Sequence, residues 1–344
     1  MSRIATGICL CVSLMMLAIS NARADEWIDL KGKDGPGKGK HIVLMAGDEE
    51  YRSEESMPMF AKILAEHHGF DCRVVFSIDP KTGLINSNLH NNTPGLEALD
   101  NADLLIILTR FRDLPADQMK HIADYVMKGK PVLGIRTATH AFDIKSGDYK
   151  MYTYNSRTPG WQGGFGKQVL GETWVNHWGS HKHQSTRAIV VQGMETSPLL
   201  RGVGEIWVST DVYEAKLPVQ PTVKPLLLGA VLSGMKPTDQ PISGKKNEPM
   251  MPIAWTKTYK LEGGQEGKSF CTTMGASSDF ESENLRRLIV NAAYWLTGLD
   301  VPAKANVDII GEYKPTDYGF RNKPGQIPPF KPEDYAKDTW PKKP

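Results

Sequence analysis

Three histidines lie within seven residues in one aromatic segment of the chain. The segment ETWVNHWGSHKHQS, residues 172 to 185, contains Trp174, His177, Trp178, His181 and His183. Neutral imidazoles at this spacing suit a transition metal such as zinc, so His177, His181 and His183 are candidate metal ligands. Alternatively, the histidines transfer protons or contact a sugar, with Trp178 stacking on a pyranose ring, or they are only hydrogen-bonding groups of a loop. The residues themselves leave these interpretations open.

A second polar group follows a short apolar run in PVLGIRTATHAF, residues 131 to 142. The run predicts a buried strand, and the turn after it carries Arg136, Thr137 and His140 but neither cysteine nor serine. An imidazole is the side chain whose pKa best suits proton transfer near neutrality. We therefore predict that His140 and His177 form an acid/base or metal-binding pair, that Arg136 orients substrate hydroxyls or a developing oxyanion, and that Thr137 binds substrate. The alternative is a structural His140 that opens the next helix.

Charged residues follow two other predicted strands. DEEYRSEES, residues 48 to 56, is expected to place solvated acidic groups at a helix start, with Arg52 directed to the substrate. RFRD offers Arg110 for a substrate hydroxyl or carboxylate, or for an ion pair with Asp113. Asp279, in the later segment MGASSDF, is a further candidate for substrate binding.

Apolar runs and helical patterns alternate in the first part of the chain and would position these residues. Strands are expected at 41–47, 72–78, 103–109 and 131–136, and helices at 57–69 and 114–130. The run at 103–109 is continuously apolar, as expected when both faces of a parallel sheet are covered. This order predicts an α/β fold with a doubly wound, mostly parallel sheet. Ligands of such sheets bind outside the carboxyl ends of the strands, where the candidate residues lie.

The rest of the chain is less regular. Residues 145 to 183 are rich in Gly, Tyr and Trp and are expected to form a long loop. Further strands are expected at 185–192, 205–210, 225–232, 251–257 and 268–274, and a helix at 281–298. Residues 302 to 344 are rich in proline, which predicts a tail that lies extended over the surface or is disordered.

The N-terminus indicates where the protein works. Residues 1 to 24 combine an early Arg3, an apolar middle and small residues at Ala22 and Ala24, which is the layout of a cleaved secretory signal. The apolar run is too short to span a bilayer. We expect cleavage after Ala24, a linker over 25–40, and a secreted or periplasmic protein free of the membrane.

Composition excludes several classes of protein. Removal of residues 1 to 24 takes two arginines from the 41 basic residues and leaves the mature chain formally neutral, without the basic face that nucleic acid requires. No phosphate-binding glycine loop and no serine-hydrolase elbow is present. Cys72 and Cys271 remain, and we expect buried thiols in neighbouring strands rather than a disulfide.

Several motifs together resemble the trehalose-utilisation (ThuA-like) family, in particular its secreted bacterial branch. The resemblance covers residues 41 to 301 and rests on HIVLMAGDEEYRSEESMPMFAKIL, GIRTATHAF, VLGETWVNHWGSHKH, PIAWTKTY and SFCTTMGASSDFESENLRRLIVNAAYWLTGLDVP. It implies the flavodoxin-like fold of class I glutamine amidotransferases. Their cysteine nucleophile is matched here by Arg136, so glutaminase activity is not expected.

The resemblance also implies a substrate class. His177 matches the loop histidine of the family, whereas Arg136 stands where relatives usually have a histidine. The family is associated with the catabolism of trehalose and related disaccharides, including 3-keto derivatives. The expected function is therefore an exported enzyme acting on such sugars by histidine acid/base or metal-assisted chemistry. The alternative is a non-catalytic module that binds a carbohydrate or a partner.

Overall fold

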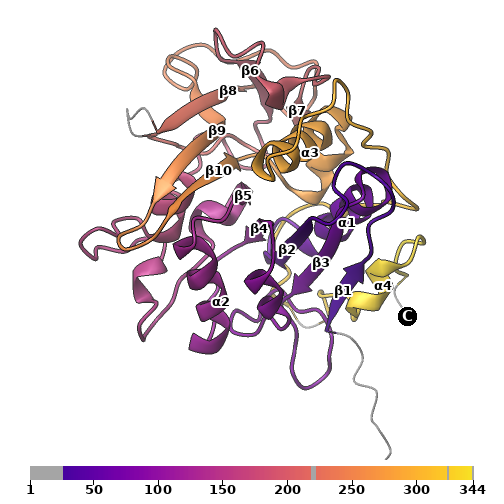
Figure 1. Ribbon diagram of the computed structural model, residues 1–344. Helices are drawn as coiled ribbons and strands as arrows, with labels where there is room; N and C mark the ends of the chain where they lie inside the picture. Colours follow the sequence, from indigo (N-terminus) through magenta and orange to yellow (C-terminus); the bar gives the residue numbers. More distant parts are fainter. Residues whose placement is uncertain (1–25, 218–221, 324, 343–344) are drawn as a thin grey trace, which may run out of the picture.

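A mixed sheet of ten strands forms the centre of the described part of the molecule (Figure 1). The computed structural model describes residues 26–217, 222–323 and 325–342, so the expected signal at 1–24 lies outside the described residues. The strands are β1 (Trp27–Leu30), β2 (His41–Gly47), β3 (Asp71–Phe76), β4 (Leu104–Thr109), β5 (Val132–Ile135), β6 (Thr186–Val190), β7 (Trp207–Val208), β8 (Val223–Val231), β9 (Met251–Lys260) and β10 (Glu266–Thr272).

The strand order is β1-β3-β2-β4-β5-β10-β9-β8-β6-β7. The five central strands from β3 to β10 are mutually parallel. The other strands join antiparallel at both ends of this core. The carboxyl ends of the parallel strands consequently meet at one edge, where the expected site residues follow β2, β4 and β5.

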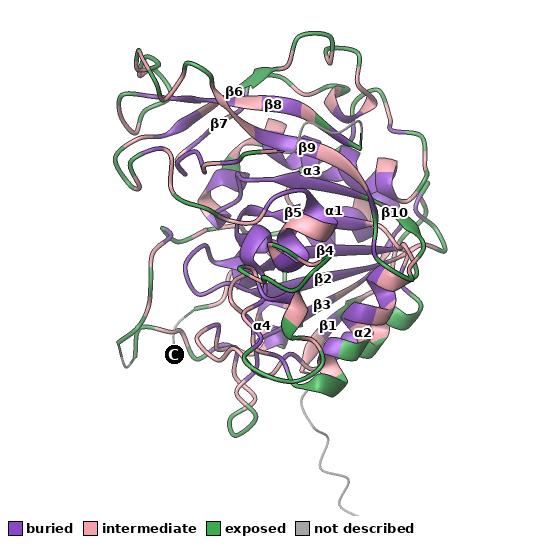
Figure 2. Ribbon diagram, turned by 90° about the vertical axis from the view of Figure 1, so that its left-hand side faces the viewer, coloured by how far each residue is buried: buried purple, intermediate pink, exposed green. Residues whose placement is uncertain are grey.

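Helices cover both faces of the parallel core. They are α1 (Ser53–His68), α2 (Ala116–Met127), α3 (Glu283–Leu296) and the short α4 (Pro332–Ala336). Alternate residues of β2 point to opposite faces: Ile42 and Leu44 pack with α1 and α3, whereas Val43 and Met45 pack with α2. Buried residues accordingly run along the central strands, while exposed ones gather on loops and on the outer side of α2 (Figure 2). The predicted doubly wound α/β fold is confirmed.

Both ends of the described chain belong to this fold. Within the segment expected to be a linker, β1 pairs with β3 and buries Ile28. The proline-rich tail does lie extended over the surface for most of its length, yet it also carries α4 and buries Tyr318, Phe330 and Tyr335 against the core. Apolar side chains spaced along an extended segment help to hold it on the domain.

The two remaining cysteines are free and buried, as expected. Their strands, β3 and β10, are not neighbours, because β2, β4 and β5 lie between them. Across the residues that the structure describes, no helix combines the length and apolar character needed to cross a membrane.

Candidate functional site

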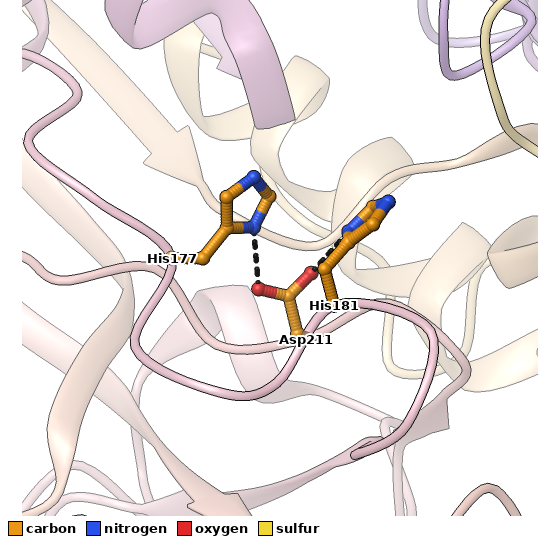
Figure 3. Close-up of side chains that lie close together, drawn as sticks. All are labelled: His177, His181 and Asp211. Atoms are coloured by element: carbon orange, nitrogen blue, oxygen red, sulfur yellow. Dashed lines mark hydrogen bonds and ion pairs between the residues drawn. The ribbon is translucent and has the colours of Figure 1, made fainter.

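Asp211 is the centre of the polar cluster that contains two of the loop histidines (Figure 3). His177 Nδ1 lies 2.7 Å from one carboxylate oxygen of Asp211, and His181 Nδ1 lies 3.1 Å from the other. The far nitrogen of His181, Nε2, lies 3.1 Å from Glu50 Oε1. The sequence analysis missed Asp211, although it directly follows the strand expected at 205–210. A carboxylate at a strand end was the signal that could have identified it.

Arg136 lies behind this cluster. It follows β5 in a left-handed conformation with φ of 47°, which is uncommon for a side chain larger than glycine. Its fully buried guanidinium donates to the backbone oxygens of Asp211 and Thr273, both at 2.6 Å, and to Asp211 Oδ1 at 2.8 Å. These partners are all protein groups, so Arg136 positions Asp211 rather than facing an open surface.

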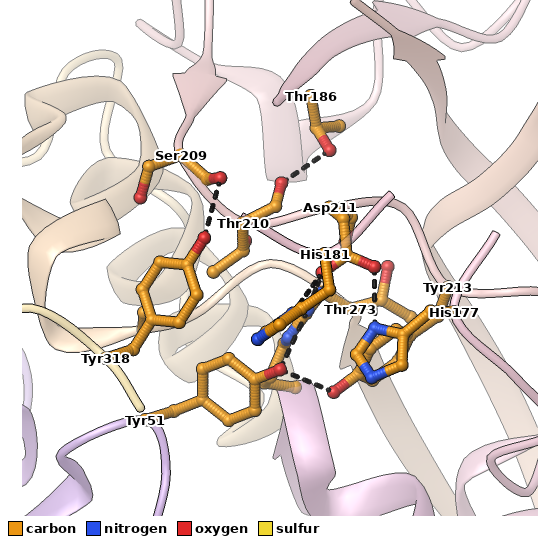
Figure 4. A network of polar contacts seen from close by, with 12 residues as sticks. Tyr51, His177, His181, Thr186, Ser209, Thr210, Asp211, Tyr213, Thr273 and Tyr318 are labelled. Atoms are coloured by element: carbon orange, nitrogen blue, oxygen red, sulfur yellow. Dashed lines mark hydrogen bonds and ion pairs between the residues drawn. The ribbon is translucent and has the colours of Figure 1, made fainter. Parts of the chain in front are cut away.

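Tyr213 brings the three expected catalytic residues together. The guanidinium carbon of Arg136 lies 3.7 Å from the centre of the Tyr213 ring. The rings of His177 and His140 lie 5.3 and 6.2 Å from the same centre. The Tyr213 hydroxyl contacts that of Tyr51, whose ring lies beside His181 in Figure 4. The sheet edge therefore gathers His140, His177 and Arg136 around one aromatic ring.

The buried cation controls the charges in this cluster. Burial alone would raise the pKa of Asp211, but Arg136 and the hydrogen bonds from His177 and His181 hold that pKa well below its usual value. Hydrogen bonds with Asp211 and Glu50 raise the pKa of His181 to about 9. At neutral pH the cluster therefore contains an ionised Asp211 and a protonated His181.

His140 has the opposite environment. It is buried, its Nδ1 lies 3.2 Å from Thr139 Oγ1, and the rings of Phe111 and Trp174 pack beside it. Burial, with Arg110 nearby, lowers the pKa of His140 well below its usual value. His140 is consequently neutral at physiological pH.

His177 is the histidine with an available nitrogen. Its side chain is 32% exposed and its Nδ1 is engaged by Asp211. No described residue forms a hydrogen bond with its Nε2. The neighbouring Trp174 has a buried indole N–H without a hydrogen-bond partner in the described structure, and its ring lies 6.0 Å from that of His177. His177 Nε2 is therefore a proton acceptor available to a bound molecule, whereas the Trp174 indole N–H is enclosed by protein.

Three other predicted site residues have protein partners. The hydroxyl of Thr137 donates to the buried Asp48. Arg52 donates to the backbone oxygens of Glu49 and Gly319. The indole nitrogen of Trp178 donates to Lys246 O at 2.9 Å. Thr137 and Arg52 are thus buried against protein groups and lack the open surface that substrate contact would need. Trp178 is partly buried, so stacking of its ring on a sugar stays a prediction.

Asp279 likewise has a structural environment. Its carboxylate accepts hydrogen bonds from the Thr210 hydroxyl and from the backbone N–H groups of Gly275 and Ala276. It borders a cavity of about 630 Å³ that also includes Trp207 but none of the clustered histidines. Direct binding of a substrate by Asp279 therefore stays a prediction.

Arg110 lies at the rim of a different cavity. Its guanidinium pairs with Glu49 and not with Asp113, which instead accepts from the Lys145 backbone N–H at 3.0 Å. Glu49 also accepts from the buried Arg112 at 2.9 Å. Arg110 therefore forms an ion pair, as the alternative interpretation predicted, but its partner is Glu49 and not Asp113.

The acidic loop after β2 is not solvated, so that prediction is wrong. Glu49, Glu50 and Glu55 are almost fully buried. The C-terminal tail covers them: Thr316 donates its backbone N–H and its hydroxyl to Glu55, and Gly319 donates its N–H to Glu50 O at 2.8 Å. A segment 260 residues away in sequence supplied this cover, which local pattern could not reveal.

The cluster also meets part of the requirement for a metal site. The ligand atoms of His177, His181 and Asp211 lie within 4.8 Å of one another. Two imidazoles and a carboxylate are a common zinc ligand set, and a zinc ion would supply a Lewis acid or an activated water. However, Arg136 already neutralises Asp211, and the exposed His183 lies outside the group. The donor types fit a metal, while the adjacent buried cation disfavours it.

The fold and this site define an α/β protein of the flavodoxin type with a histidine–carboxylate centre at its carboxyl edge. Residues 41–296 match the family model ThuA, described as trehalose utilisation. This match spans most of the chain, so the protein belongs to the ThuA family, as the sequence motifs indicated. Membership indicates a role in sugar metabolism.

Solved structures resemble the chain at low sequence identity. A ThuA-like protein from Parabacteroides merdae is 14% identical, with 87% of this chain and 100% of that chain covered and a TM-score of 0.49. PurLQS from Thermotoga maritima is 12% identical, with 75% and 99% covered and a TM-score of 0.37. No curated protein matches the sequence.

Proposed function

We propose that the protein is an exported enzyme of glycoside catabolism that acts on trehalose-like disaccharides or their 3-keto derivatives, with His177 as the general acid/base. The single observation that carries the proposal is the 2.7 Å contact between His177 Nδ1 and Asp211, with Nε2 left available. The substrate class comes from the family, and the chemistry comes from this geometry.

The contact with Asp211 sets the tautomer of His177. An ionised Asp211 accepts a hydrogen bond from the Nδ1–H of His177, so the neutral imidazole carries its lone pair on Nε2. In a 3-keto sugar, Nε2 then takes the proton from the carbon between the keto group and the glycosidic carbon, where C–H acidity is raised. The electron pair of that C–H bond forms a double bond to the glycosidic carbon while the bond from the glycosidic carbon to the leaving oxygen breaks. Asp211 stabilises the imidazolium that forms, and the same Nε2 returns the proton to the leaving oxygen.

The surrounding residues support this exchange. Arg136 keeps Asp211 ionised and in place. The Trp174 ring packs beside His177, with ring centres 6.0 Å apart. Neutral His140 closes the apolar side of the site between Phe111 and Trp174.

The test is turnover of 3-keto-trehalose and trehalose by the mature protein and by His177→Gln. We expect turnover of at least one sugar by the wild type and its loss in the variant. Absence of turnover across a panel of such glycosides, with and without divalent metals, contradicts the proposal. Sugar binding that persists in both proteins without turnover would instead favour the non-catalytic module.

A metal-dependent hydrolase is the second candidate, and the grouping of His177, His181 and Asp211 favours it. Elemental analysis of protein purified without a histidine tag distinguishes the two. A stoichiometric metal that is lost in His181→Gln supports the second candidate, and a metal-free active protein excludes it.

A further inference from the structure

A second cavity lies at the carboxyl edge of the sheet, apart from the histidine cluster. It has a volume of about 370 Å³ and is lined by Glu49, Asn88, His90, Arg110, Phe320 and Asn322. Its walls come from the loops after β2, β3 and β4 and from the C-terminal tail. Phe320 and Asn322 belong to the C-terminal tail and lie outside residues 41–296, the range that matches the family model. Part of the cavity wall is therefore formed by residues beyond that range.

The tail is fixed where it passes this cavity. On one side of Phe320, Gly319 donates its N–H to Glu50 O at 2.8 Å, and Arg52 donates to Gly319 O. On the other side, the Asn88 side chain donates to Arg321 O at 2.8 Å. Anchors on both sides hold Phe320 in place even though its side chain is among the exposed large apolar ones, at 47%.

Arg110 lies between the loop after β4, which carries Phe111, and the C-terminal tail, which carries Phe320. Its guanidinium carbon lies 4.6 Å from the centre of the Phe111 ring and 4.9 Å from that of Phe320. One of its nitrogens pairs with Glu49, and the described residues offer no other hydrogen-bond acceptor to the rest of the guanidinium. The remaining N–H groups are therefore available to a ligand.

His90 adds a neutral polar group. Burial and the nearby Arg112 and Arg110 lower the pKa of His90 to about 4, so its imidazole is uncharged near pH 7. Its Nε2 lies 3.9 Å from Glu49, too far for a hydrogen bond. The cavity thus combines amide, imidazole, guanidinium and carboxylate groups with one exposed aromatic ring. Planar polar groups that bind hydroxyls, facing an aromatic surface that packs on C–H bonds, are the features that bind a pyranose ring.

Three packed aromatic side chains lie between the cavity and the histidine cluster. Phe111, which stacks under Arg110, packs against His140 with ring centres 5.0 Å apart, and His140 lies 5.3 Å from Trp174. Trp174 in turn neighbours His177. We infer that this cavity is a glycosyl subsite that binds a neutral pyranose ring of the sugar on which the protein acts. The inference rests on the proposed function for the class of this ligand.

Equilibrium binding to the full mature chain tests the subsite separately from catalysis. Calorimetric titrations with trehalose, 3-keto-trehalose, glucose and glucuronate compare the wild type with Phe320→Ala and Asn322→Ala. Ile189→Ala is the matched control, since Ile189 is also exposed, at 39%, and lies on β6. We expect the Kd of the disaccharide to rise about tenfold in the two tail variants and to stay constant in the control.

The outcomes separate the subsite from the enzyme. Disaccharide binding that is equally tight in Phe320→Ala and Asn322→Ala overturns the subsite while leaving the proposed function intact. Weakened binding without turnover of any sugar supports the subsite and contradicts the enzyme. Tighter binding of glucuronate than of glucose overturns the assignment to a neutral ring, and a wild type that binds none of these sugars overturns the subsite altogether.

Discussion

Arg136 contacts Asp211 at two points: one guanidinium nitrogen donates to the Asp211 backbone oxygen at 2.6 Å and another to its side chain at 2.8 Å. Both side chains are buried. The residue that occupies the turn after β5 therefore sets the charge and the position of the carboxylate that orients both histidines. Arg136 thus occupies the position of the amidotransferase cysteine nucleophile, and here its guanidinium holds Asp211, the partner of His177.

Replacing Asp211 with Asn should destabilise the protein by about 3–5 kcal/mol, because it leaves the buried Arg136 charge without its partner. Denaturant unfolding measures this loss. The matched control is Asp29→Asn, which breaks the exposed pair of Asp29 and Arg73 and should cost about 0–1 kcal/mol. Equal losses of unfolding free energy in the two variants would show that the buried Arg136–Asp211 pair contributes no more to stability than an exposed pair.

Replacing His177 with Gln should lower kcat/KM on a sugar substrate about 100- to 10,000-fold, because the proton acceptor is lost. The midpoint of thermal unfolding should stay near that of the wild type, since the side chain is partly exposed. His183→Gln is the control, because His183 is exposed and lies outside the cluster. An active His177 variant would exclude this residue as the acid/base group.

The stability of the protein should fall in alkaline solution through His181. The folded-state pKa of His181 is raised to about 9 from an ordinary 6.5, so its contribution is complete below about pH 6.5 and is lost as the pH rises through 9. Unfolding free energies measured between pH 6 and 10 should decline in the wild type and decline less in His181→Gln. Parallel curves for the two proteins would contradict this assignment.

Gly166→Ala should disturb the turn that carries His140. A Cβ at Gly166 would lie 2.0 Å from the backbone oxygen of Thr139, a contact that forces the backbone to move. We expect a loss of about 1–3 kcal/mol in unfolding free energy, together with reduced activity. Gly204→Ala is the control, since its nearest neighbour is the flexible Asn284 side chain at 3.1 Å. A fully stable and active Gly166→Ala protein would argue against a tightly packed turn.

Much of the fold followed from local sequence pattern. β2 begins and ends where the apolar run at 41–47 predicted, and β3, β4 and β5 lie within one or two residues of their expected ranges. α3 spans Glu283–Leu296 inside the predicted 281–298, with Ser282 accepting a hydrogen bond from the Leu285 N–H at its start. Continuous apolar runs and helix caps are encoded by neighbouring residues, so they can be read directly.

The local sequence made His177, His181 and His183 candidates, but it did not show which of them lie together or how they are held. His177 and His181 were candidates because of their type and spacing. Their partner Asp211 lies 30 or more residues away, and Arg136 reaches it from another strand. Tertiary contacts decided the charge of each group: burial left His140 neutral, while ion pairs and hydrogen bonds within the cluster outweighed burial and kept Asp211 ionised and His181 protonated.

The sequence by itself determined the family, the α/β core and the segment that carries the histidines, because these depend on motifs and on short-range periodicity. Only the tertiary structure decided that Arg136 supports Asp211, and that the tail covers the acidic loop and supplies Phe320. The reason is physical: hydrogen bonds and ion pairs between segments 75 to 267 residues apart form only after the chain has folded, and no local pattern encodes them.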